Sequence, residues 1–115
     1  MKLRLHRGSL RLRLSQSDIA CLHDTGKVEE ELVFAPGKQL RYILETGAAE
    51  TSATFEDSNI VVALPTREAT RWMESDDTGI EASVGELKLL IEKDFQCLHR
   101  EPEPGEDSFP NPLAE

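Results

Sequence analysis

A regular alternation of leucine with polar residues near the start of the chain constrains the fold more than any other feature. Leucine occupies every second position over residues 2–6 and again over residues 9–14, and most positions between them are basic. A period of two is typical of a β-strand with one face in the core and the other in water. Arg7-Gly8 lies between the two segments and fits a tight turn. The first fourteen residues therefore predict a β-hairpin.

The rest of the chain predicts six more strands and two short helices. Ser15 and Asp18 have the spacing of a capping box, which begins a helix. Ala69, Trp72 and Met73 form the apolar stripe of a second helix. The six further strands are expected over residues 27–34, 39–46, 51–56, 59–64, 80–84 and 86–95.

The order of these elements is strand–strand–helix–strand–strand, and the same order follows again. Residues 14–19 match residues 64–69 at an offset of 50, and Asp-Thr-Gly occurs at both 24–26 and 77–79. This pattern indicates an internal pseudo-repeat of about 50 residues. The alternative is that two short helices in such a domain look alike by chance. We predict an α+β fold in which duplicated ββαββ units form an antiparallel barrel or two packed sheets with two short helices.

The sequence predicts a single α+β domain over residues 1–99, followed by an acidic, proline-rich tail over residues 100–115. No apolar stretch approaches the roughly 20 residues that span a bilayer. The start of the chain lacks the continuous apolar segment of a secretory signal peptide. Two cysteines do not indicate a disulfide scaffold. We therefore expect a cytoplasmic protein with no membrane partner.

Charge is distributed unevenly along the chain. The net charge is −9, but residues 1–14 carry five basic residues and no acidic one. The overall acidity argues against nucleic-acid binding, which needs a positive field. A basic segment of this kind can mark an anion site. The alternative is that the basic strands pair with acidic ones, such as the strand that carries Glu29, Glu30 and Glu31.

Five basic residues on predicted strands form the candidate anion-binding site: Lys2, Arg4, Arg11, Arg13 and Arg41. Arginine suits this role because its planar guanidinium binds two phosphate oxygens at once. If the basic faces lined the inside of a barrel, a polyphosphate would be a plausible ligand. If they pointed outward, they would be an ordinary solvated face, which is the interpretation we favour.

A second candidate site is a metal site formed by Cys97 and His99. The tripeptide Cys-Leu-His occurs there and also at residues 21–23, so the chain contains two thiols and two imidazoles that could bind zinc. Residues two apart share a side of an extended segment, whereas in a helix they point apart. No complete catalytic motif or cofactor motif is present, so we predict no cofactor and leave open whether the protein is an enzyme.

Several segments together resemble a family of small uncharacterised bacterial proteins. They are Met-Lys-Leu-Arg-Leu at the start, Ser-Leu-Arg-Leu-Arg-Leu-Ser-Gln-Ser-Asp at residues 9–18, Ile-Glu-Lys-Asp-Phe-Gln-Cys-Leu at 91–98 and Phe-Pro-Asn-Pro at 109–112. The resemblance covers most of the chain and implies a bacterial, cytoplasmic, single-domain protein. That family has no known activity to carry over.

At the level of fold, the chain also resembles the triphosphate-tunnel (CYTH-type) hydrolases, which are duplicated barrels with Arg and Lys lining a channel. Their Glu-x-Glu-x-Lys motif is missing, since residues 2–6 read Lys-Leu-Arg-Leu-His, and this puts their chemistry in doubt. We predict a small non-catalytic domain that binds a ligand or a protein, with a phosphate- or polyphosphate-binding or hydrolysing barrel as the alternative. The expected partner is an unidentified protein or a small anionic ligand, and a homodimer is a further alternative.

Overall fold

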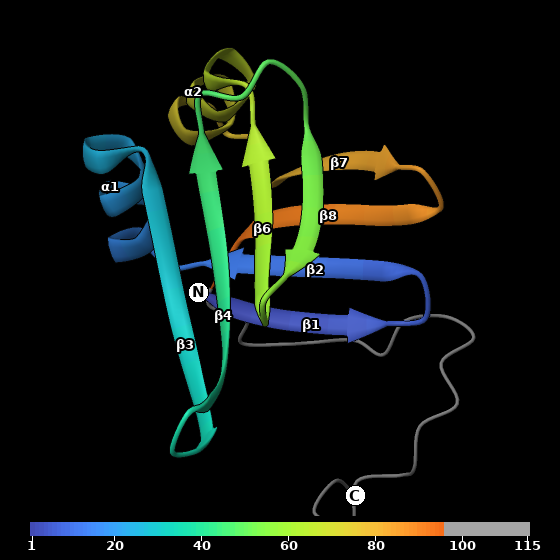
Figure 1. Cartoon of the computed structure of the whole chain (residues 1–115). Coiled ribbons are helices and arrows are strands. Elements are labelled where there is room, and N and C mark those ends of the chain that lie inside the picture. Colours follow the sequence, from blue (N-terminus) through green and yellow to red (C-terminus); the bar gives the residue numbers. More distant parts are fainter. Residues whose placement is uncertain (96–115) are drawn as a thin grey trace, which may run out of the picture.

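The computed structural model describes residues 1–95, which form eight strands and two helices (Figure 1). In chain order the elements are β1 (Lys2–His6), β2 (Ser9–Leu14), α1 (Gln16–Thr25), β3 (Lys27–Ala35), β4 (Lys38–Thr46), β5 (Ser52–Glu56), β6 (Asn59–Leu64), α2 (Thr66–Glu74), β7 (Gly79–Val84) and β8 (Leu87–Lys93). The predicted elements are all present, and their bounds differ from the sequence expectation by two residues at most. The predicted end of the domain at residue 99 and the tail over 100–115 lie outside the described residues.

The strands form two packed four-stranded sheets and not a closed barrel. Sheet A has the strand order β1-β2-β8-β7, and sheet B has the order β3-β4-β6-β5. The strands of one sheet run across those of the other, and both helices lie at one end of sheet B (Figure 1). The α+β class is therefore confirmed, in its two-sheet form.

Each sheet combines a hairpin from the first half of the chain with a hairpin from the second half. The two hairpins of sheet A meet where β2 pairs with β8, and those of sheet B meet where β4 pairs with β6. Both of these junctions are parallel, so the expectation of purely antiparallel pairing is wrong at the two central strand pairs. Hairpin loops dictate antiparallel pairing only within a hairpin. The connection between β4 and β6 runs through β5, and the connection between β2 and β8 runs through all of sheet B and both helices, so each is long enough for parallel pairing.

The β1–β2 and β5–β6 hairpins have the same register at a constant offset of 50. Lys2 pairs with Arg13 in the first hairpin, and Ser52 pairs with Ala63 in the third. Both hairpins turn through two residues with positive φ, 42° and 39° over Arg7-Gly8 and 50° and 65° over residues 57–58. Two such residues match the twist of the flanking strands. The duplication of the sequence itself stays a prediction.

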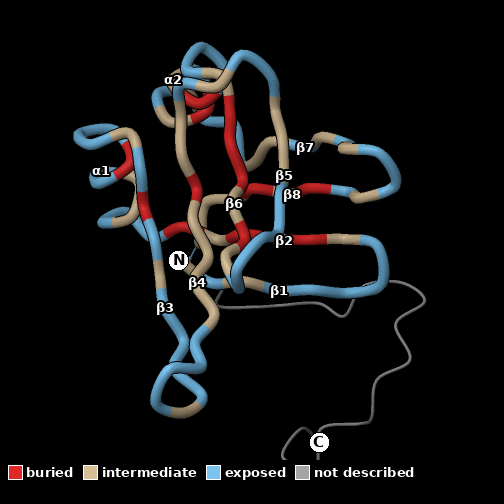
Figure 2. Tube along the Cα trace, in the orientation of Figure 1, coloured by how far each residue is buried: buried red, intermediate tan, exposed pale blue. Residues whose placement is uncertain are grey.

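The core lies between the inner faces of the two sheets and continues under the helices (Figure 2). Alternate residues of the four central strands are buried there, as the period of two predicts. They are Leu10, Leu12, Leu14, Leu44, Ile60, Val62, Leu64, Leu89 and Ile91. Leu22 and Trp72 add the buried faces of α1 and α2.

Local signals fix the ends of α1. The Ser15 hydroxyl accepts a hydrogen bond from the Asp18 N–H at 3.2 Å, and the Asp18 carboxylate accepts one from the Ser15 N–H at 2.9 Å. This confirms the predicted capping box. Gly26 ends the helix in the left-handed conformation, and its N–H donates to the Leu22 carbonyl at 2.8 Å. Neither helix in the described part of the chain is long and apolar enough to cross a membrane.

Candidate functional site

The basic side chains of β1 and β2 lie on the outer face of sheet A. Leu10, Leu12 and Leu14 are buried, so Arg11 and Arg13 between them point to the other side of the sheet. The side chains of Arg11 and Arg13 are 26% and 29% exposed to solvent. The outward orientation favoured from the sequence is therefore the one observed, and these side chains do not line the interior between the two sheets.

Four of these residues form two cross-strand pairs of like charge. Lys2 lies directly opposite Arg13, and Arg4 lies directly opposite Arg11. Residues opposite one another in a sheet have Cβ atoms about 5 Å apart, and alternate residues along a strand are about 7 Å apart. Like charges placed in this way destabilise a sheet. We call these four residues the cationic face.

Two carboxylates lie against the cationic face. Glu92 on β8 is in register with Arg13, and its Oε1 lies 3.0 Å from Arg11 Nε and 3.8 Å from Arg13 Nε. The Asp94 carboxylate lies 2.9 Å from Lys2 Nζ. Arg4 forms no ion pair with any residue between 1 and 95. The four cations are thus only half neutralised by acidic neighbours.

The acidic strand expected to neutralise these cations is in the other sheet. Residues 27–35 form β3, which pairs only with β4 in sheet B. The neutralising residue is instead Glu92, whose orientation the sequence left open. The alternation of residues along a strand shows which face of that strand each residue occupies. It does not show which strand lies beside β2, because that pairing joins residues far apart in the sequence.

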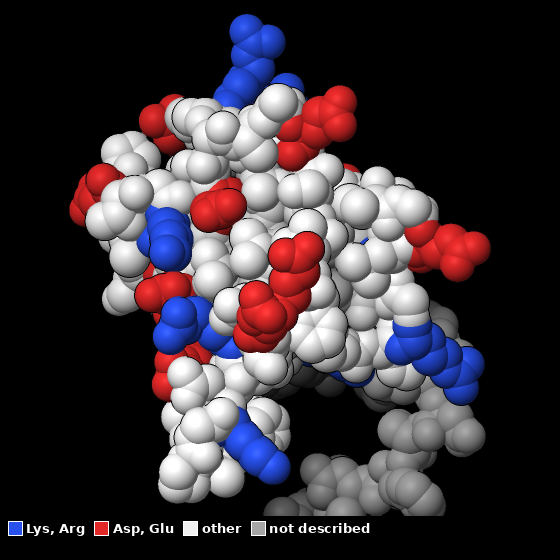
Figure 3. Space-filling model, in the orientation of Figure 1, with Lys and Arg blue, Asp and Glu red and all other residues white. Residues whose placement is uncertain are grey.

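Arg41 does not join the cationic face. It lies on β4, opposite Glu31 on β3, and its Nη2 donates to Glu31 Oε2 at 3.0 Å. This hydrogen bond, together with the charges of Glu29 and Glu31, raises the pKa of Arg41. Sheet B shows acidic and basic side chains interspersed on its outer face (Figure 3). Arg41 therefore belongs to a mixed-charge surface on the opposite side of the molecule.

A cluster around the amino terminus holds β1 in place. The Met1 amino group lies 2.8 Å from both the Asp18 and the Glu30 carboxylates, and the Tyr42 hydroxyl donates to the Met1 carbonyl at 3.0 Å. Burial alone would lower the pKa of the amino group, but hydrogen bonds from it to the two carboxylates raise that pKa above 8.0. These contacts join the strand that carries Lys2 and Arg4 to α1 and β3.

Asp18 has the matching shift. Its partial burial alone would raise the pKa of the carboxyl, but hydrogen bonds from the Met1 amino group and from Ser15 lower that pKa below 3.8. Burial, with the charges of Glu30 and Asp18 nearby, raises the pKa of Tyr42 above 10.0. The cluster is therefore strongest when the amino group is protonated and both carboxyls are ionised.

The predicted metal residues Cys97 and His99 lie outside the described residues. The other copy of the tripeptide is on α1, where Cys21 and His23 are both exposed. No group of three or more His, Cys, Asp or Glu side chains within residues 1–95 is arranged to hold a metal ion. The metal site at Cys97 and His99 therefore stays a prediction.

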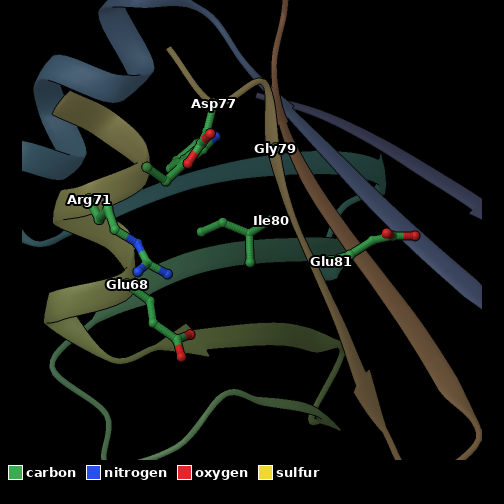
Figure 4. A pocket seen from close by; sticks show the side chains of 7 residues that line it. Glu68, Arg71, Asp77, Gly79, Ile80 and Glu81 are labelled. Atoms are coloured by element: carbon green, nitrogen blue, oxygen red, sulfur yellow. The ribbon is translucent and has the colours of Figure 1, made fainter. Parts of the chain in front are cut away.

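A separate hollow of about 260 Å³ lies between α2 and the start of β7 (Figure 4). Its lining includes Glu68 and Arg71 on α2 and Asp77 and Glu81 on the other side. The guanidinium of Arg71 points into the hollow near Glu68, whereas Glu81 points away from it (Figure 4). One cation among several carboxylates does not favour an anion, and the charges are too mixed to indicate a ligand class.

The chain matches the model of a family of unknown function (DUF7009) over residues 1–113. Neither a search of curated proteins nor a search of solved structures returned a match. The match covers nearly the whole chain, so the cationic face, the two sheets and the following segment all belong to the region that defines this group.

Proposed function

The chain belongs to this family of unknown function, so its chemistry has to be inferred from its own surface, and we propose that it binds a compact polyanion on the cationic face of sheet A. The ligand class is a chain of linked phosphates, either an inorganic polyphosphate or the phosphates of a nucleotide. The proposed role is binding without catalysis.

The observation that carries the proposal is the placement of two like-charged cross-strand pairs side by side. Like-charged cross-strand pairs lower the stability of a sheet, and proteins keep such unfavourable features where they serve a function. A bound polyanion would offset the repulsion between these four cations. From the general spacing of strands, the Cβ atoms of the four residues lie at the corners of a patch about 5 Å by 7 Å. Neighbouring phosphates in a polyphosphate can each reach two corners of such a patch.

Arg4 has a special place in this proposal. Arg11, Arg13 and Lys2 each have an acidic neighbour within 4 Å, whereas Arg4 forms no ion pair among residues 1–95. Its guanidinium is therefore the group that a phosphate can contact without displacing a carboxylate. Hydrogen bonds to a charged group contribute about 1.5–3 kcal/mol, so removing Arg4 should weaken binding about tenfold or more.

Hydrolysis is not part of the proposal. Metal-dependent phosphate hydrolysis needs carboxylates that hold the metal beside the scissile phosphate. On β1 the outward residues are instead Lys2, Arg4 and His6. Within residues 1–95 the carboxylates that lie against the cationic face are Glu92 and Asp94, and both are ion-paired with its basic side chains.

Isothermal titration calorimetry with tripolyphosphate at low and physiological salt tests the proposal. We expect binding that weakens with salt, about tenfold loss in the Arg4→Ala variant, and unchanged binding in the Arg41→Ala variant. Arg41 is the matched control because it is an exposed strand arginine on the other sheet. Equal losses in the two variants would mean that the protein attracts anions without a site, and no heat in the unaltered protein would overturn the proposal.

A further inference from the structure

The outer face of sheet A extends beyond the cationic face onto β8 and β7. On both strands alternate residues point inward: Leu89 and Ile91 of β8 are buried, and Ile80 and Ala82 of β7 pack on the core. The residues between them therefore point outward, on the same side of the sheet as the cationic face. These outward residues are Lys88, Leu90 and Glu92 on β8 and Gly79, Glu81 and Ser83 on β7.

Leu90 differs in kind from the other residues of this outer face. Among the outward residues of the four strands of sheet A, all within residues 1–95, Leu90 alone has an apolar side chain. It is partly exposed, and it is not among the side chains of the described chain that pack on the core. Its apolar surface is therefore available to a ligand.

The strand pairing places Leu90 directly beside the cationic face. Arg4 pairs with Arg11, and Arg11 pairs with Leu90. On its other side Leu90 pairs with Glu81. Neighbouring strands lie about 5 Å apart, so Leu90 is one strand from Arg11 and two strands from Arg4. One row across the sheet thus changes from cationic to apolar to acidic.

The charges around Leu90 oppose a phosphate at this position. Glu92 lies two residues further along β8 on the same face, about 7 Å away by the general spacing of a strand, and Glu81 lies on the next strand. Lys88 neutralises only part of this charge, since its Nζ is 4.0 Å from Glu81 Oε1 and both side chains are about two-thirds exposed. A chain of phosphates anchored on the cationic face is therefore disfavoured across β8, whereas an uncharged group is not.

A nucleotide carries an uncharged, planar group beside its phosphates. Nucleobases bind proteins by laying their flat faces on apolar or aromatic side chains and on guanidinium planes. The ribose separates the base from the nearest phosphate by roughly the spacing of neighbouring strands. A nucleotide with its phosphates on the cationic face can therefore place its base over Leu90, between Arg11 and Glu81. An inorganic polyphosphate has no group that uses this surface.

We propose that the ligand of the cationic face is a nucleoside triphosphate and that its base lies on Leu90. This inference rests on the proposed function, because the cationic face anchors the phosphates. It narrows the ligand class from linked phosphates in general to nucleotides. Leu90 holds the base by apolar contact alone, so it distinguishes a nucleotide from inorganic polyphosphate better than it distinguishes one base from another.

Calorimetric titrations of the full chain with ATP and with tripolyphosphate, at the same salt concentration, test the proposal. Leu90→Ser should weaken ATP binding about threefold to tenfold, because the base loses apolar contact with the leucine side chain. The same variant should bind tripolyphosphate as the unaltered protein does. Equal losses for the two ligands, or unchanged ATP binding, would overturn the proposal.

Two further variants make the result specific. Leu32→Ser, on β3 of the other sheet, removes a leucine that is 52% exposed and should leave the binding of both ligands unchanged. Leu90→Phe keeps an apolar surface on a residue type that suits a strand, and it should bind ATP at least as tightly as the unaltered protein. A loss of ATP binding in Leu90→Phe as large as in Leu90→Ser would contradict contact between the base and this side chain.

Nuclear Overhauser contacts in the ATP complex locate the base directly. We expect contacts between the adenine ring protons and the methyl groups of Leu90. Ile80 provides the contrast, because it points inward on β7 and lines the hollow beside α2. Contacts of the adenine protons with Ile80 in place of Leu90 would put the base in that hollow and overturn the proposal.

The two ligands separate this inference from the proposed function. If both ligands bind on the cationic face but Leu90→Ser affects neither, the proposed function stands and the assignment of a nucleotide fails. If neither ligand gives heat with the unaltered protein, the proposed function fails and this inference fails with it.

Discussion

Replacing Glu92 by glutamine is the most informative single change for the proposed anion site. The Glu92 carboxylate lies 3.0 Å from Arg11 Nε, and a phosphate between Arg4 and Arg11 would lie about 4 Å further on, at about 7 Å. At that distance two unit charges repel by about 0.6 kcal/mol in bulk water and by about 2.4 kcal/mol at the effective dielectric constant near a protein surface. The Glu92→Gln variant should therefore bind tripolyphosphate more tightly than the unaltered protein.

Removing a repulsion of about 0.6 to 2.4 kcal/mol should raise the affinity for tripolyphosphate about threefold to fiftyfold. Because Glu92 is 25% exposed and salt screens charges beyond about 8 Å at physiological ionic strength, the lower part of that range is expected there. In the absence of ligand the same variant should be less stable by up to about 1 kcal/mol, since Arg11 and Arg13 lose a partly exposed ion pair.

Calorimetric titration at constant ionic strength measures this gain, and Glu81→Gln is the matched control. Glu81 is on β7 of the same sheet and pairs only loosely with Lys88, at 4.0 Å with both side chains about two-thirds exposed. Its removal changes the net charge equally but leaves the cationic face intact. Equal gains in both variants would mean that only net charge matters. Weaker binding in Glu92→Gln would refute the assignment of Glu92 as a competitor of the ligand.

Three further predictions concern stability and are checked by urea unfolding. The pKa of the Asp18 carboxyl is lowered in the folded protein, so Asp18 stabilises the fold above pH 3.8 and loses this effect as the pH falls through its folded-state pKa. The pKa of the Met1 amino group is raised, so this group stabilises the fold below pH 8.0 and loses the effect as the pH rises through its folded-state pKa. Stability should therefore be greatest between those limits, and Asp18→Asn should flatten the acid side; an unchanged pH profile would contradict the cluster. Leu12→Ala, at a fully buried position, should cost about 2–5 kcal/mol, and a cost under about 1 kcal/mol would contradict the described core. Gly79→Ala should cost about 1–3 kcal/mol, because a Cβ there would lie 2.9 Å from the Ile91 carbonyl oxygen, and a neutral effect would refute that close approach.

The elements of the fold could be predicted from the sequence because the signals for them are local. Alternating residues mark the strands, the Ser15–Asp18 capping box begins α1, and the stripe through Ala69 and Trp72 marks the buried face of α2. Each signal involves only residues close together in the sequence, so it can be recognised without knowing the tertiary structure. The bounds of Asn59–Leu64 match the expectation at both ends.

The arrangement of strands between the sheets could not be predicted in the same way. Residues of β2 pair with residues of β8 that lie 79 positions further along the chain, and no local sequence pattern predicts that pairing. This pairing places Glu92 beside Arg11 and separates Arg41 from the other basic residues. Four of the five residues predicted for the anion site therefore come together, and the fifth depends on a long-range contact that periodicity does not encode.

The most direct test of anion binding on the cationic face is to map amide chemical-shift changes as tripolyphosphate is added to the isotope-labelled protein. We predict saturable changes in β1, β2 and the part of β8 around Glu92, with none in β3 and β4 around Arg41. The changes in β1 should be lost in the Arg4→Ala variant. Changes spread over both sheets, or centred on β3 and β4, would contradict the cationic face as the binding site.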